Sequence, residues 1–130
     1  MSHSVKIDIS NGELLDKLSI LEIKLKHIKD DNKLLNIQKE YDTLVQFATN
    51  LLTNDAITEQ YTKLQNINAK LWNIENYIRI KEHNKQFDNE FIELARSVYI
   101  TNDQRAEIKR HINMLTGSVF IEEKSYEQYS

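Results

Sequence analysis

The segment 88–115 carries the residues whose types and spacing could do chemistry. Arg105 and Lys109 lie one helical turn apart, so both side chains fall on the same face of a helix. Thr101 precedes them in the pattern of a capping box, with Gln104 three residues later, which predicts that a helix begins directly after Thr101. The free amides and the dipole at a helix start bind anions. This pattern predicts a site for phosphate or for a sugar-nucleotide pyrophosphate.

Side chains from both sides of this helix start complete the predicted anion site. Its ligand-binding residues are Arg96, Tyr99, Thr101, Asn102, Asp103, Arg105, Lys109 and Lys124. Arg96 would reach the site from the preceding helix and Lys124 from the C-terminal tail. An alternative interpretation needs no ligand, and we favour it: Thr101 and Gln104 cap the amides, while Asp103 and Glu107 neutralise the cations. No catalytic residue is identified.

Two other pairs of polar residues are weaker candidates. Asp16 and His27 lie on an otherwise apolar flank of the first expected helix, where a carboxylate could be a base with a raised pKa. A salt bridge from Asp16 to an arginine of a neighbouring helix is the interpretation that we favour. Glu107 and His111 are spaced as half of a metal site, and no second cluster has ligand spacing. We therefore expect neither a metal nor a cofactor.

The composition sets the class of protein. The chain has 130 residues, a net charge of −3, no cysteine, no proline and two glycines, Gly12 and Gly117. These numbers predict one helical domain without disulfides, and they exclude a glycine-rich phosphate loop. The negative charge argues against nucleic acid as a partner. No apolar run approaches 18 residues, so we expect no membrane span and a cytoplasmic location in a bacterium or a virus-infected cell.

Hydrophobic spacing and cap residues predict five helices. Their ranges are 10–29, 32–53, 55–83, 88–100 and 102–116, followed by a polar tail over 122–130. The expected fold is all-α: an antiparallel bundle of three long helices with a shorter helical pair packed on the third. Residues 5–9 alternate apolar and polar side chains, which predicts a short strand paired with 119–121.

Three pieces of the sequence resemble an uncharacterised family of small helical proteins from bacteria, phages and large DNA viruses. They are GELLDK at 12–17, SVYITND at 97–103 and EEKSY at 122–126. The resemblance covers nearly the whole chain. It implies no established activity and no site residue, and the genomic surroundings of the family hint at glycan metabolism.

The first expected helix is apolar on two flanks, because Ile20 and Ile23 form a second stripe beside its main seam. Surplus apolar surface of this kind marks a subunit contact. The sequence therefore predicts a non-enzymatic interaction or assembly module that forms a homodimer, with a further protein partner as an option. The alternative is the binding or modification of a phosphate-bearing carbohydrate or nucleotide at the Arg96–Lys109 junction.

Overall fold

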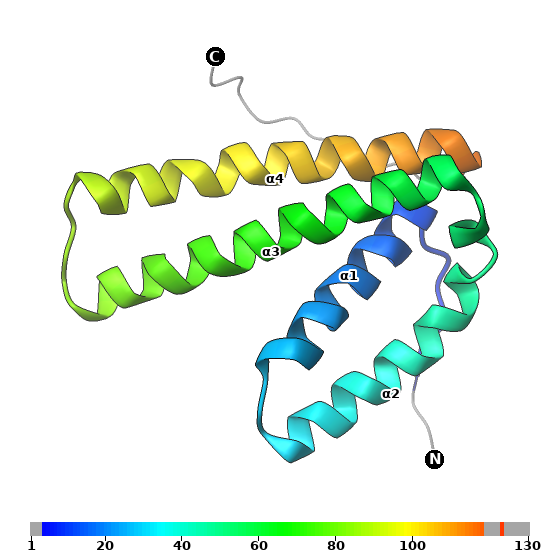
Figure 1. Cartoon of the computed structure of the whole chain (residues 1–130), viewed down its shortest axis with the longest axis horizontal. Coiled ribbons are helices and arrows are strands. Elements are labelled where there is room, and N and C mark those ends of the chain that lie inside the picture. Colours follow the sequence, from blue (N-terminus) through cyan, green and yellow to red (C-terminus); the bar gives the residue numbers. More distant parts are fainter. Residues whose placement is uncertain (1–3, 119–122, 124–130) are drawn as a thin grey trace.

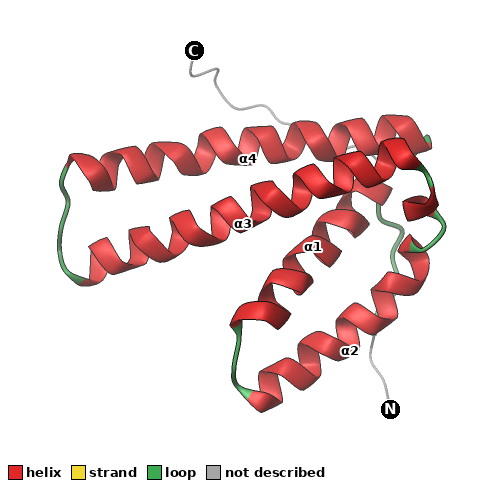
Figure 2. Cartoon of the chain, viewed as in Figure 1, coloured by secondary structure: helices red, strands yellow, loops and turns green. Residues whose placement is uncertain are grey.

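The computed structural model describes residues 4–118 and Glu123, and within them the chain is all-α, as the sequence predicts. The helices are α1 (Asn11–His27), α2 (Asp31–Ala48), η1 (Leu51–Thr53, a single 3₁₀ turn), α3 (Asp55–His83) and α4 (Asn89–Thr116). No strand occurs in this part of the chain (Figure 2). Residues 5–9 lie outside any regular element, and 119–121, their expected partner, fall outside the described residues.

Side-chain caps begin all four α-helices, which explains why their starts were predictable. The Ser10 hydroxyl accepts the Glu13 N–H at 3.1 Å, and Asp30, Asn54 and Asp88 cap α2, α3 and α4 in the same manner. Such a cap satisfies amides that have no partner within the helix. Gly117 ends α4 with φ 64°, a left-handed conformation that suits glycine.

The predicted pair of helices at 88–100 and 102–116 is wrong, because a single helix, α4, spans both. Thr101, the expected cap, is only 1% exposed and lies in the middle of the helix. It belongs to a stripe of buried and half-buried residues at 4-3 spacing that continues through the expected break. The stripe consists of Phe91, Leu94, Val98, Thr101, Arg105, Ile108 and Ile112. Packing of this stripe overrides the local capping pattern.

The helices form two antiparallel hairpins, α1–α2 and α3–α4, that meet at one end (Figure 1). α1 contacts each of the other three helices. The hydrophobic core lies around the first half of α1 and consists of Leu14, Leu15, Leu18, Ala48, Ile57, Tyr61, Leu64 and Ile112. Because α1 diverges from α4 beyond this point, the core occupies one end of the α3–α4 hairpin only.

The other end of that hairpin, residues 72–100, borders the end of α1 at Trp72 and from there extends away from α1 and α2, and we call it the arm (Figure 1). Ile74 is its one buried apolar side chain. At its tip Phe87 and Phe91 pack edge to face, with ring centroids 5.3 Å apart. Lys81 bridges Asp88 at 3.0 Å and thereby ties the two helices together. The arm is thus a two-helix structure with little interior of its own.

Candidate functional site

The structure removes the helix start on which the predicted anion site depended. Residues 102–104 lie inside α4, where the amides donate to carbonyls four residues earlier and do not face a ligand. Arg96 lies on the arm and pairs with Glu93 at 3.1 Å. Hydrogen bonding to Tyr99 and the charge of Glu93 raise the pKa of its guanidinium above the ordinary value. Lys124 falls outside the described residues.

Arg105 and Lys109 lie together, as predicted, but both contact carboxylates of α1. The Arg105 guanidinium donates to Asp16 through Nε at 2.8 Å and through Nη2 at 2.5 Å. The Lys109 ammonium lies 2.8 Å from Glu13 and 3.9 Å from Asp16. The prediction that Asp16 pairs with an arginine of a neighbouring helix is therefore confirmed.

α3 supplies a further hydrogen-bond donor to Asp16, which is only 1% exposed. The Asn68 amide donates to Asp16 at 2.9 Å and to the Ser19 hydroxyl at 2.6 Å, and this hydroxyl donates to the Asp16 carbonyl. We call the set Glu13, Asp16, Asn68, Arg105 and Lys109 the charged centre. It joins three helices by polar contacts next to the hydrophobic core.

The backbones of α1 and α4 approach closely beside the charged centre. The Gly12 N–H donates to the Asn113 side chain at 2.7 Å, and the Asn11 N–H donates to the Ser118 hydroxyl at 2.9 Å. A Cβ at Gly12 would overlap the Lys109 carbonyl. The glycine is therefore required by the helix crossing and not by a special backbone angle.

The charges of this centre balance one another. Two carboxylates, Glu13 and Asp16, face two cations, Arg105 and Lys109, at ion-pair distance. Removing such groups from water is costly, and each cation here has an anion in contact with it. The carboxylates that pair with Arg105 and Lys109 come from α1, whereas the sequence predicted Asp103 and Glu107 for this role. The charged centre orients α1 on the α3–α4 hairpin.

A second polar cluster joins α1 to α3 one turn beyond Ser19. The Tyr61 hydroxyl donates to the Glu22 carboxylate, which also accepts from Gln65 at 2.8 Å. Burial raises the pKa of Tyr61 far above its ordinary value, and the hydrogen bond and charge of Glu22 act in the same direction. The phenol remains a donor at any ordinary pH.

A groove of about 500 Å³ separates the second half of α1 from α3. Its lining is Ile20, Ile23, Asn68, Leu71, Trp72, Glu75, Asn76, Arg79 and Arg105. His27 of α1 stacks on Trp72, with ring centroids 5.5 Å apart. The two arginines of the groove pair with Asp16 and, at 4.0 Å, with Glu75. This groove thus offers apolar surface and no excess charge.

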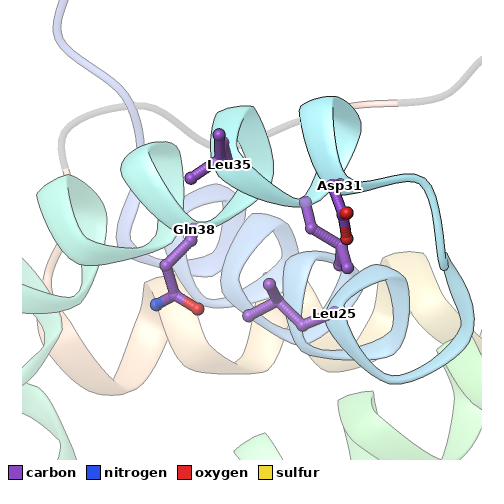
Figure 3. A pocket seen from close by; sticks show the side chains of 5 residues that line it. Leu25, Asp31, Leu35 and Gln38 are labelled. Atoms are coloured by element: carbon purple, nitrogen blue, oxygen red, sulfur yellow. The ribbon is translucent and has the colours of Figure 1, made fainter.

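Another hollow, of about 540 Å³, lies at the turn between α1 and α2. Its lining is Leu25 of α1 with Asp31, Leu34, Leu35 and Gln38 of α2, and Figure 3 shows Leu25 and Gln38 between the two helices. Leu35 is 70% exposed at this place. Among the described residues that line this hollow, Asp31 is the one titratable side chain.

Within the described residues no three histidine, cysteine or acidic side chains are grouped as metal ligands. Glu107 and His111 therefore belong to no such group in the part of the chain that the structure describes. No helix in the same part of the chain is both long and apolar enough to cross a membrane.

Sequence reasoning missed two members of the charged centre, Asn68 and Glu13, and the neighbouring Asn113. Asn68 interrupts the apolar stripe between Leu64 and Leu71, and a buried amide at such a position was a detectable signal. Glu13 was assigned to capping, but its carboxylate contacts Lys109. Nothing local indicated Asn113, because its partner Gly12 lies 101 residues away.

Comparison with known proteins agrees with the resemblance seen in the sequence. No curated protein and no solved structure matches the chain. One family model, described as a family of unknown function (DUF6165), matches residues 5–129, which is nearly the full length. The chain therefore belongs to this family of unknown function.

Proposed function

We propose that the protein is a non-enzymatic helical module that assembles into homodimers through its arm. The observation that carries the proposal is a change in exposure along one stripe of α4. Ile92, Tyr99, Ala106 and Asn113 recur every seven residues and so share one side of the helix. α1 covers Asn113, which is 2% exposed, whereas Tyr99 is 43% and Ile92 50% exposed. A second copy would cover what α1 does not reach.

The exposed apolar residues of α3 support the same proposal. Tyr77 is 59% and Ile80 55% exposed, and both lie on the arm. Apolar side chains grouped on a surface are a feature of subunit contacts. The arm also lacks an interior to stabilise it, since two helices alone bury little apolar area. Association would supply that missing area.

The alternative function, binding of a phosphate-bearing carbohydrate or nucleotide, loses its main support. It required cations that converge on an open site, and Arg105 and Lys109 contact Asp16 and Glu13. A phosphate would have to displace these carboxylates. An interaction module needs no such rearrangement.

Light scattering at micromolar concentration tests the proposal. The wild-type protein is expected to have about twice the monomer mass of 15.4 kDa. Replacing both Ile80 and Ile92 by glutamate places charges on the arm, and this variant is expected to be monomeric. Leu35→Glu is the matched control: Leu35 is at least as exposed but belongs to the α1–α2 hairpin, so the dimer remains.

The reverse pattern would refute the proposal. A wild-type monomer at these concentrations would remove self-association, and a dimer lost only in Leu35→Glu would move the contact to the α1–α2 hairpin. Far-ultraviolet circular dichroism of each variant shows whether its helices are intact.

A further inference from the structure

We propose that two copies of the protein pack through the outer side of α4 in antiparallel orientation, with Arg96 of each copy paired to the partner's Asp103. This inference rests on the proposed function and adds to it the face, the direction and the contacts of the dimer. It follows from the spacing, exposure and charge of five residues of α4.

These residues form a continuous line along the helix. Their order is Ile92, Arg96, Tyr99, Asp103 and Ala106, and the intervals alternate between four and three. This spacing is the seam of an antiparallel or coiled-coil contact. We call it the outer stripe. It lies on a different side of α4 from the buried stripe that contains Thr101 and Arg105.

The outer stripe is most accessible in its first half, from Ile92 to Tyr99. Ile92, Arg96 and Tyr99 are exposed, and Asp103 and Ala106 are half-buried. Apolar residues alternate with charged ones, so the stripe has anchors of both kinds. A homodimeric contact of this composition is self-complementary only when its two copies align opposite charges.

Antiparallel packing achieves that alignment. With the two-fold axis level with Tyr99 and Ile100, each Arg96 lies opposite the partner's Asp103, and both ion pairs form at once. The two Tyr99 rings then meet near the axis, and Ile92 lies against the partner's Ala106. Parallel packing would instead place Arg96 against Arg96, a like-charge contact that disfavours this orientation.

The ion pairs of the isolated chain leave these charges available for the partner. Asp103 has no ion-pair partner among the residues that the structure describes. Arg96 pairs with Glu93 in an exposed contact between residues three apart, which solvent weakens, and it hydrogen bonds with Tyr99 of the same stripe. The dimer would add a second carboxylate to the same guanidinium.

Charge exchange between the two positions tests the inference. Arg96→Asp and Asp103→Arg each create two like-charge contacts in an antiparallel dimer, so each variant is expected to have a dissociation constant at least about tenfold above that of the wild type. Mixing the two variants restores opposite charges across the interface. The mixture is expected to form a heterodimer, and the double variant is expected to form a homodimer again.

Sedimentation velocity over a concentration series measures these constants. Arg79→Asp is the matched control, since Arg79 is an exposed arginine of the arm on α3, and it is expected to retain wild-type affinity. Ile80→Glu, which lies on α3 beside the proposed contact, is expected to weaken the dimer less than Ile92→Glu does.

Each contrary result has a distinct meaning. If the wild type dimerises but both charge variants retain its affinity, or their mixture stays monomeric, the antiparallel α4 contact is wrong while self-association stands. If the wild type is a monomer, the proposed function fails first and this inference with it.

Discussion

The two ends of the α3–α4 hairpin differ in what surrounds their charged residues. At one end α1 brings Asp16 and Glu13 against Arg105 and Lys109, and every one of these charges has an opposite charge in contact. At the arm the same helix carries charged and apolar side chains without a third helix to cover them. α4 itself is regular throughout. The part of α4 that α1 contacts is therefore buried, and the part that α1 does not contact stays exposed and can bind a partner.

This difference separates two roles for similar residue types. A charge beside α1 serves the fold, because its removal leaves an uncompensated ion in a water-poor place. A charge on the arm has little effect on the fold, because exposed ion pairs contribute little. Variants at the two ends should thus change different measured quantities: stability at the charged centre and association at the arm.

The largest expected effect is the loss of Asp16. In Asp16→Asn the carboxylate that Arg105 and Asn68 contact becomes neutral, and its new N–H group opposes the guanidinium. Breaking a buried pair in this way costs about 3–5 kcal/mol of unfolding free energy, a large share of the stability of a small domain. Urea denaturation of the variant and the wild type at equal concentration measures the change.

Two further variants keep this prediction testable. Glu59→Gln removes an exposed ion pair with Lys63 of 4.0 Å on α3 and should leave the unfolding free energy nearly unchanged. Replacing Asp16 and Arg105 together by leucine removes both charges and should be less destabilising than Asp16→Asn. Equal losses in Asp16→Asn and Glu59→Gln would contradict a structural role for the charged centre.

The helix starts were predictable from sequence because capping is local. The serine, asparagine and aspartate residues that begin α1, α3 and α4 bond amides two or three residues away. The same local logic failed at Thr101, where the capping pattern is present but the buried stripe of α4 continues through it. The helix continues through Thr101 because the residues one turn before and one turn after it, Val98 and Arg105, also pack against other parts of the protein. No local sequence pattern indicates that burial.

The sequence predicted that Asp16 pairs with an arginine, but it did not predict which arginine. A carboxylate on the apolar flank of the first helix indicated an arginine partner from another helix. The choice of Arg105 depended on the crossing of α1 and α4, since 89 residues separate it from Asp16. Residues so distant meet only in the fold, and nothing in the local sequence distinguishes Arg105 from Arg96.

An intermediate effect is expected at Gly12, where α1 and α4 approach each other closely. Gly12→Ala places a methyl group against the Lys109 carbonyl and 2.9 Å from the Asn113 side chain. Alanine favours helix, so a loss of stability here reports the crossing and not the propensity. Overpacking of this kind costs about 1–3 kcal/mol. Thermal unfolding monitored by circular dichroism measures it.

Gly117→Ala is the comparison variant, because a methyl group at this glycine would contact no neighbouring atom. Gly117 needs its left-handed φ of 64°, and a Cβ there meets no atom within 4 Å. Its replacement is expected to weaken the end of α4 while leaving the contact between Gly12 and Asn113 unchanged. If Gly12→Ala proved neutral or stabilising, the close approach of α1 and α4 would be wrong.

The smallest expected effect concerns Tyr61 and appears only at high pH. Its folded-state pKa is raised by burial and by Glu22, whereas the unfolded chain releases the proton near pH 10. A group with a raised pKa contributes stability fully below its unfolded value and loses that contribution as the pH rises further. Above pH 10 the wild type should therefore lose up to about 1.4 kcal/mol per pH unit through this residue. In Tyr61→Phe this part of the alkaline loss disappears.

Urea denaturation at pH 8, 10 and 11 gives the two slopes, and their difference isolates Tyr61 from lysines that titrate in the same range. Tyr77→Phe changes an exposed phenol of the arm and should keep the wild-type slope. Identical slopes in wild type and Tyr61→Phe would mean that the phenol ionises as readily in the folded chain as in the unfolded one. The buried contact between Tyr61 and Glu22 would then not hold α1 against α3, and the contrast between a closed core end and an open arm would rest on the charged centre alone.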